Sequence, residues 1–154
     1  MYEVGAILYG VFTLSQNDTK HKYAVVIERD EEGCLVTTFT TSQERSGSPI
    51  PVHGANPSIK EPQSYVFLSS VEIGIDPRTN IPFFFPRNTC IVPDYGFTKK
   101  TITEFESKVH DLVKVCQLYE HEVIDLFYTL YKCKRVPRWV KQLLERKLEE
   151  LSAD

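Results

Sequence analysis

Histidine and cysteine are the side chains of this chain best suited to proton transfer or metal binding, and their spacing limits that chemistry. The histidines are His21, His53, His110 and His121, and no two of them stand four residues apart. The cysteines are Cys34, Cys90, Cys116 and Cys133, and they form no C-x-x-C pair. Because zinc sites use such close spacings, we expect no metal or other cofactor and interpret the cysteines as reduced core residues.

A cluster of cations lies near the C-terminal end. Its members fall within ten residues and are Lys132, Lys134, Arg135, Arg138 and Lys141. The dipole of a helix favours cations near its C-terminus, so a solvated helix end is one interpretation. A contact with nucleic acid or with an acidic partner is the other.

Familiar enzyme signatures are missing from the sequence. It has no Walker loop, no G-x-G-x-x-G, no H-E-x-x-H and no G-x-S-x-G. This gives no support to a P-loop hydrolase, a dehydrogenase, a zinc protease or an α/β-hydrolase.

Length and composition indicate one globular domain over residues 1–154. The chain is 42% apolar and 25% charged, which excludes a disordered or low-complexity protein. A net charge of −3 argues against a polybasic nucleic-acid binder. The acidic start MYEVG is unlike a secretory signal, and no stretch reaches the roughly 18 apolar residues of a membrane span. We therefore expect a cytoplasmic protein without membrane contact.

The pattern changes along the chain from strands to helices. Residues 1–98 alternate apolar runs with turns, whereas residues 99–154 contain one proline and no glycine. This predicts an α+β fold with a small β part followed by a helical part. We expect five to six strands, with a bulge or bend at Gly10. The predicted strands cover residues 5–14, 22–28, 34–41, 65–75 and 81–92, the last as one or two short strands, and the second and third form a hairpin.

The helical part has its own start signals. Thr103 followed by Glu106 is typical of a capping box and predicts a helix start. The apolar spacing then fits one long helix to Tyr131 or two helices broken near Leu118. A further helix is predicted from Pro137, a favoured first-turn residue, to about Leu151.

A long loop separates the third and fourth predicted strands. Residues 42–63 contain four of the nine prolines, and they are Pro49, Pro51, Pro57 and Pro62. Loops of this length are unusual unless they are functional, so we interpret the segment as a candidate binding loop.

Three consecutive segments of the β part resemble the PemK/MazF family of ribonuclease toxins. The family begins with a glycine and an apolar strand, as GAILY does at residues 5–9. A polar loop then leads to an R-P-A-V-V-I type strand, which KYAVVI at residues 22–27 resembles. A V-P-x-T-[ST] type segment follows, and VTTFTTS at residues 36–42 is similar to it.

This resemblance implies a fold, a reaction and partners. The expected fold is an SH3-like barrel, here with a C-terminal helical extension, that forms a homodimer. The expected activity is cleavage of single-stranded RNA without metal, inhibited by a cognate antitoxin protein. The family's catalytic arginine corresponds to Lys22 and its catalytic threonine to Thr40. Because lysine lacks the bidentate guanidinium, His21 is added as a candidate that transfers protons.

Further side chains could contact the RNA. Thr41 follows the candidate threonine, and Arg45 and His53 in the long loop could reach phosphate groups. Tyr9, Phe12 and Tyr23 could stack bases or pack in the core. A non-catalytic SH3-like module that binds protein or nucleic acid is the alternative function, and a helical partner protein that uses residues 103–151 is a third.

Overall fold

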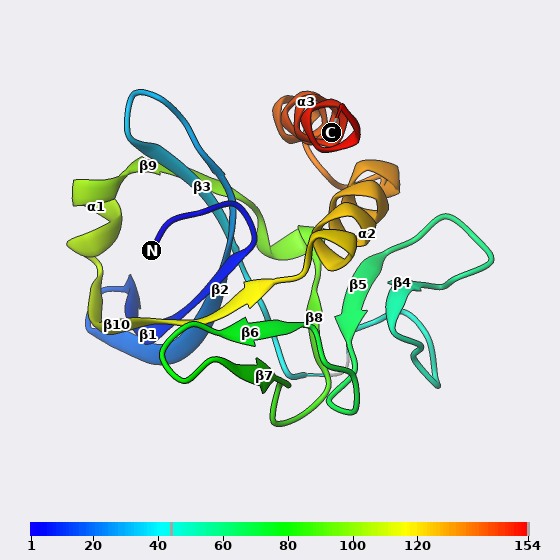
Figure 1. Cartoon of the computed structure of the whole chain (residues 1–154), viewed down its shortest axis with the longest axis horizontal. Coiled ribbons are helices and arrows are strands. Elements are labelled where there is room, and N and C mark those ends of the chain that lie inside the picture. Colours follow the sequence, from blue (N-terminus) through cyan, green and yellow to red (C-terminus); the bar gives the residue numbers. More distant parts are fainter. Residues whose placement is uncertain (44, 154) are drawn as a thin grey trace.

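Ten strands and three α-helices make up the computed structural model, which describes residues 1–43 and 45–153 (Figure 1). Seven strands form an antiparallel sheet in the order β7-β6-β10-β1-β2-β3-β9, and three form a second sheet in the order β4-β5-β8. The strands are β1 (Ala6–Ser15), β2 (Asp18–Arg29), β3 (Cys34–Phe39), β4 (Gly54–Asn56), β5 (Ser64–Phe67), β6 (Gly74–Asp76), β7 (Ile81–Phe83), β8 (Thr89–Ile91), β9 (Thr98–Thr101) and β10 (Val109–Leu118). The helices are α1 (Ile102–Glu106), α2 (Glu120–Lys132) and α3 (Arg138–Ser152). The predicted α+β class is confirmed.

The long β1–β2 hairpin lies in the middle of the larger sheet. Asn17 in its turn has a φ of 60°, a left-handed conformation that asparagine tolerates. The strand β2 begins earlier than predicted because Thr19 still pairs with Thr13 of β1. The predicted hairpin between β2 and β3 is confirmed by their antiparallel pairing.

The predicted irregularity at Gly10 is confirmed. The register between β1 and β10 shifts between Tyr9 and Val11, which is the position of a bulge. A Cβ atom on Gly10 would lie 2.7 Å from Cγ2 of Val109 and 3.1 Å from the carbonyl oxygen of His110. Glycine is therefore required here by the close approach of β10.

The predicted helix over residues 109–118 is wrong, because this segment is the strand β10. It pairs with β1 from Ala6 opposite Gln117 to Phe12 opposite Val109, and with β6 on its other side. A short apolar run does not reveal by its period alone whether it forms a helix or a buried strand. The β-branched side chains of Val109, Val113 and Val115 suit the strand, and pairing on both sides stabilises it.

The prediction of five to six strands is also wrong. Residues 65–75 form two strands, β5 and β6, that belong to different sheets, with a turn at Leu68 to Val71 between them. The long loop contains the short strand β4, which pairs with β5. The second sheet joins the first through a bridge between Thr41 and Cys90.

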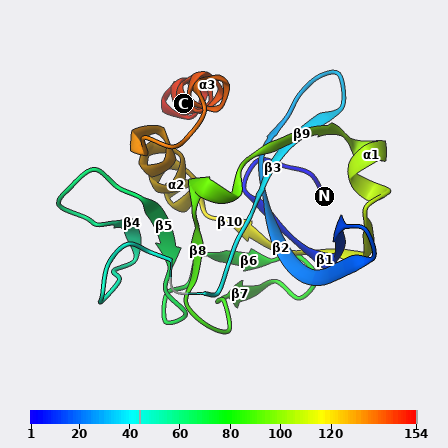
Figure 2. The ribbon, with the colours of Figure 1, turned by 180° about the vertical axis from the view of Figure 1, so that it is seen from behind.

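Helix α2 covers the second sheet, and α2 and α3 together complete the core. Helix α2 packs against β4 and β5, and α3 packs on α2, as Figure 2 shows from behind. The main core cluster joins Val25 of the large sheet, Phe67 of the small sheet, Leu126 of α2 and Leu144 of α3. Helix α3 starts near the predicted position, with Pro137 as its N-cap residue. The region predicted to be helical thus contains β10 before α2 begins.

The capping box lies two residues before the predicted one. The Thr101 hydroxyl accepts from the Glu104 amide at 3.1 Å, and the Glu104 carboxylate accepts from the Thr101 amide at 3.0 Å. Replacing Thr101 by alanine is expected to lower the free energy of unfolding by about 1 kcal/mol, which is about 2–4 °C in Tm. Thermal unfolding followed by circular dichroism measures this. The variant Thr103→Ala should unfold like the wild type, and a larger loss there would contradict the assignment.

Candidate functional site

A cavity of about 280 Å³ lies where the β1–β2 hairpin meets the segment that follows β3 and the start of β8. Tyr9 of β1 and residues 20–23 of β2 form one wall. Residues 40–43, which follow β3, and residues 86–89, which lead into β8, form the others. The structure therefore brings together four of the six residues predicted for the site, and they are His21, Lys22, Thr40 and Thr41.

Strand alternation divides these residues between two faces. Tyr23 and Thr40 are adjacent across β2 and β3, where the Thr40 amide donates to the Tyr23 carbonyl oxygen at 3.0 Å. Alternate residues share a face, so His21 lies on the same side as Tyr23 and Thr40. Lys22 is directed toward the opposite face, across from Gly10, although it also belongs to the lining of the cavity.

Aromatic rings support His21. The imidazole stacks on the Tyr9 ring with centroids 5.7 Å apart and an interplanar angle of 21°. Tyr9 in turn contacts Tyr23 at 4.5 Å. Burial, with a smaller contribution from Tyr9, raises the pKa of Tyr23, which therefore stays protonated at neutral pH and keeps its hydroxyl as a donor. His21 itself is exposed, so a ligand can reach its imidazole.

Thr40 lies at the floor of the cavity. Its exposed fraction is 3%, whereas Ser42 and Gln43 beyond it are exposed. A hydroxyl that lines the cavity can donate a hydrogen bond to a group bound there.

The charges around the cavity are of one sign. Lys20, Lys22 and Arg87 line it, and none of its described lining residues carries a carboxylate. These three cations form no ion pair within the part of the chain that the structure describes. In a chain with a net charge of −3, such a concentration of positive charge favours an anionic ligand.

Sequence reasoning missed Arg87 and Lys20. Arg87 stands after Pro86 in a segment predicted to be strand, and its sequence neighbours carry no signal for a site. Only the antiparallel bridge between Thr41 and Cys90 brings its segment beside the end of β3. The guanidinium absent at position 22 is thus present in the same cavity at position 87.

A second cavity of about 390 Å³ continues from the first. The two cavities share Ser42, Gln43 and Arg87 as lining residues. Arg45, predicted to bind substrate, lines this second cavity and not the first. It is exposed in the segment that follows β3.

His53, which was predicted to contact substrate, does not line the first cavity. Its Nε2 atom is 2.8 Å from the buried carboxylate of Glu122, which also accepts from the Tyr65 hydroxyl. The Leu68 amide donates to His53 Nδ1 at 3.1 Å, so Nε2 carries the proton and donates to Glu122. Burial and the hydrogen bond from its hydroxyl to Glu122 raise the pKa of Tyr65. The histidine therefore fastens the long loop to α2.

All four cysteines are free, three of them buried and Cys34 half-buried. Within residues 1–43 and 45–153 no three His, Cys, Asp or Glu side chains are grouped to hold a metal ion. None of the described helices has the length and apolar character that a membrane span needs.

Comparison of the chain with protein-family models, with curated proteins and with solved structures found no match.

Proposed function

We propose that this protein is a PemK/MazF-like endoribonuclease that binds and cleaves single-stranded RNA in the first cavity. The observation that carries the proposal is the lining of that cavity. Cations without ion pairs, an exposed imidazole and a threonine hydroxyl meet there, and no described carboxylate opposes them. Phosphate groups supply most of the affinity of such sites, and aromatic rings such as Tyr9 supply stacking for bases.

The proposed reaction uses the 2′-hydroxyl of the RNA as the nucleophile. His21 takes the proton of this hydroxyl while the O2′–P bond forms and the P–O5′ bond breaks. The leaving 5′-oxygen takes up a proton from solvent, and His21 later returns its own to solvent. Arg87 stabilises the charge that develops on the phosphorus oxygens, and Thr40 donates to one of them. Lys22, which also lines the cavity, adds positive charge that attracts the phosphate. The products are a 2′,3′-cyclic phosphate and a 5′-hydroxyl.

The same resemblance supports a finer proposal for the fold and the partners. The order β1-β2-β3 with antiparallel pairing matches the three segments that resemble the family. We propose that the bent larger sheet is an enlarged SH3-like barrel, that the protein is a homodimer, and that an antitoxin covers the cavity.

Binding without cleavage is the second candidate function. Two observations favour it: Thr40 is buried at the cavity floor, and lysine replaces arginine at position 22. In that case the protein is a nucleic-acid-binding module that uses the same cations.

Incubation of the purified protein with unstructured RNA in the presence of EDTA tests the proposal. We expect fragments that end in a 2′,3′-cyclic phosphate. The variant Arg87→Lys is expected to cleave about tenfold more slowly, because it keeps the charge but loses the bidentate fork. Gel analysis of end-labelled RNA measures both rates.

The matched control is Arg78→Lys, which changes an arginine paired with Asp76 outside the cavity. It should cleave at the wild-type rate. Salt-dependent RNA binding without cleavage would support the second candidate function, a non-catalytic nucleic-acid-binding module. An absence of both cleavage and binding would overturn the RNA proposal.

A further inference from the structure

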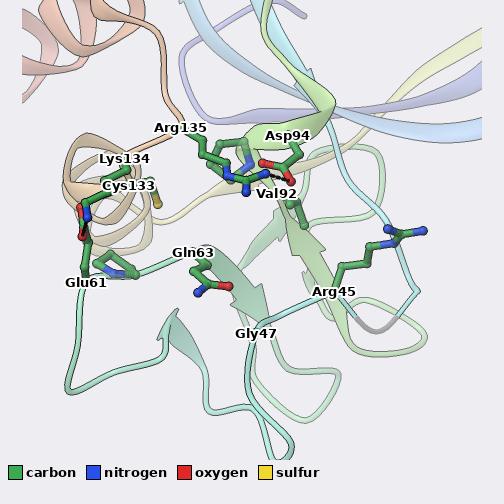
Figure 3. Close-up of a pocket in the computed structure, with 11 residues that line it drawn as sticks. Arg45, Gly47, Glu61, Gln63, Val92, Asp94, Cys133, Lys134 and Arg135 are labelled. Atoms are coloured by element: carbon green, nitrogen blue, oxygen red, sulfur yellow. Dashed lines mark hydrogen bonds and ion pairs between the residues drawn. The ribbon is translucent and has the colours of Figure 1, made fainter.

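A third cavity, of about 420 Å³, lies beside the turn between α2 and α3 (Figure 3). Lys134 and Arg135 of that turn form one wall. Residues 61–63, residues 92–94 and the pair Arg45 and Gly47 form the others. In Figure 3 the Arg45 guanidinium points away from Lys134, at the opposite end of the cavity.

The three cavities follow one another along the same two segments. Residues 40–43 line the first cavity, residues 42–43 and 45–46 contribute to the second, and Arg45 and Gly47 line the third. On the other side, Pro86, Arg87 and Thr89 line the first two, and residues 92–94 line the third. Arg45 belongs to both the second and third cavities, so the path has a cation at its junction.

The third cavity differs from the first because two of its cations, Lys134 and Arg135, are paired with carboxylates. Lys134 Nζ is 3.2 Å from Glu61 Oε2, and Arg135 Nη1 is 2.7 Å from Asp94 Oδ2. The side chains of the two cations are 81% and 76% exposed. Ion pairs at such exposure are weak because water screens them, so a phosphate can replace the carboxylate at small cost.

We propose that RNA bound in the first cavity continues through the second into the third, where Lys134 and Arg135 exchange Glu61 and Asp94 for backbone phosphates. This inference rests on the proposed function. The carboxylates of Glu61 and Asp94 disfavour a free anion in the third cavity. The third cavity therefore adds to the RNA affinity only when the RNA strand is already held in the first cavity. Tethering raises the effective concentration of the next phosphates and drives the exchange. The helical turn then extends the binding site of the sheet.

Binding of two uncleavable 2′-O-methyl oligonucleotides to the full chain tests the inference. One has about four nucleotides and fills the first cavity, and the other has about twelve and can reach the third. The wild type should bind the longer one more tightly. The double variant Lys134→Gln/Arg135→Gln should bind the longer one about tenfold more weakly and the shorter one unchanged. Loss of two phosphate contacts should also lower the slope of log K against log salt by about 1.4 for the longer one.

Two further variants separate the path from general charge effects. Arg29→Gln/Lys108→Gln removes the same charge at exposed positions outside the three cavities and should leave both affinities unchanged. Glu61→Gln/Asp94→Asn removes the competing carboxylates and should tighten binding of the longer oligonucleotide several-fold. A purely structural role of the two ion pairs predicts no such gain.

The outcomes distinguish the two proposals. A wild type that binds neither oligonucleotide overturns the RNA proposal and the path together. A wild type that binds both equally, or a Lys134→Gln/Arg135→Gln variant that binds the longer one like the wild type, overturns the path alone. Equal weakening of both oligonucleotides in that variant also contradicts the path, because the shorter one does not reach the third cavity.

Discussion

The variant His21→Ala is expected to cleave RNA about 10²- to 10⁴-fold more slowly than the wild type, with little change in RNA affinity. This imidazole is exposed, stacked on Tyr9 and on the same face of the sheet as Thr40. Its removal deletes the group that takes the 2′-hydroxyl proton, and general base catalysis contributes about this factor. The cations that bind phosphate are retained. Single-turnover cleavage of an end-labelled RNA, together with binding of its 2′-O-methyl analogue, measures the two effects separately.

The control is His110→Ala, which removes an exposed histidine of β10 outside the cavity and should cleave normally. Added imidazole should restore part of the activity of His21→Ala, because a diffusible base can replace the side chain. If His21→Ala cleaves at the wild-type rate, His21 has no catalytic role. If the His21→Ala variant loses RNA binding and cleavage in the same proportion, His21 contributes to RNA binding and not to the chemical step.

The variant Glu122→Leu is expected to lower the free energy of unfolding by about 3 kcal/mol. The Glu122 carboxylate is buried and accepts from both the Tyr65 hydroxyl and His53 Nε2. Leucine leaves the buried Tyr65 hydroxyl without an acceptor, at a cost of about 1–3 kcal/mol, and releases the loop that His53 holds. Denaturant unfolding measures the loss, and hydrogen exchange in residues 48–56 reports release of the loop.

A double variant tests whether the cost comes from the unpaired hydroxyl. Tyr65→Phe/Glu122→Leu should lose less stability than the two single variants added together, because phenylalanine has no hydroxyl to leave unpaired. Glu120→Gln changes an exposed carboxylate in the same helical turn and should stay within about 0.5 kcal/mol of the wild type. If the losses in free energy of unfolding of the two single variants simply add in the double variant, the unpaired Tyr65 hydroxyl is not the source of the destabilisation.

Local chemistry predicted the parts of the fold that depend on near neighbours. The β2–β3 hairpin was predictable because two runs of strand-forming residues are joined by a short charged turn that ends in Gly33. The bulge at Gly10 and the start of α3 after Pro137 were predictable for the same reason. Each of these features is decided by the conformations that a few consecutive residues allow.

Distant pairing decided the parts that were predicted wrongly. The apolar residues of 109–118 fit a helix as well as a strand, and only insertion between β1 and β6 makes them a strand. The run at 65–75 reads as one strand, yet its two ends pair with β8 and with β10 in different sheets. These choices depend on partners more than forty residues away for β10 and β6, which no local pattern reveals.

For the site, the sequence by itself determined that His21 and Lys22 stand beside Thr40 and Thr41, because the hairpin of β2 and β3 that pairs these segments is local. Only the tertiary structure decided that Arg87 joins them, that His53 turns to Glu122, and that Lys134 and Arg135 line a third cavity that shares Arg45 with the second. The physical reason is that side-chain convergence across sheets and helices depends on burial of the common core, whose contacts join residues far apart along the chain.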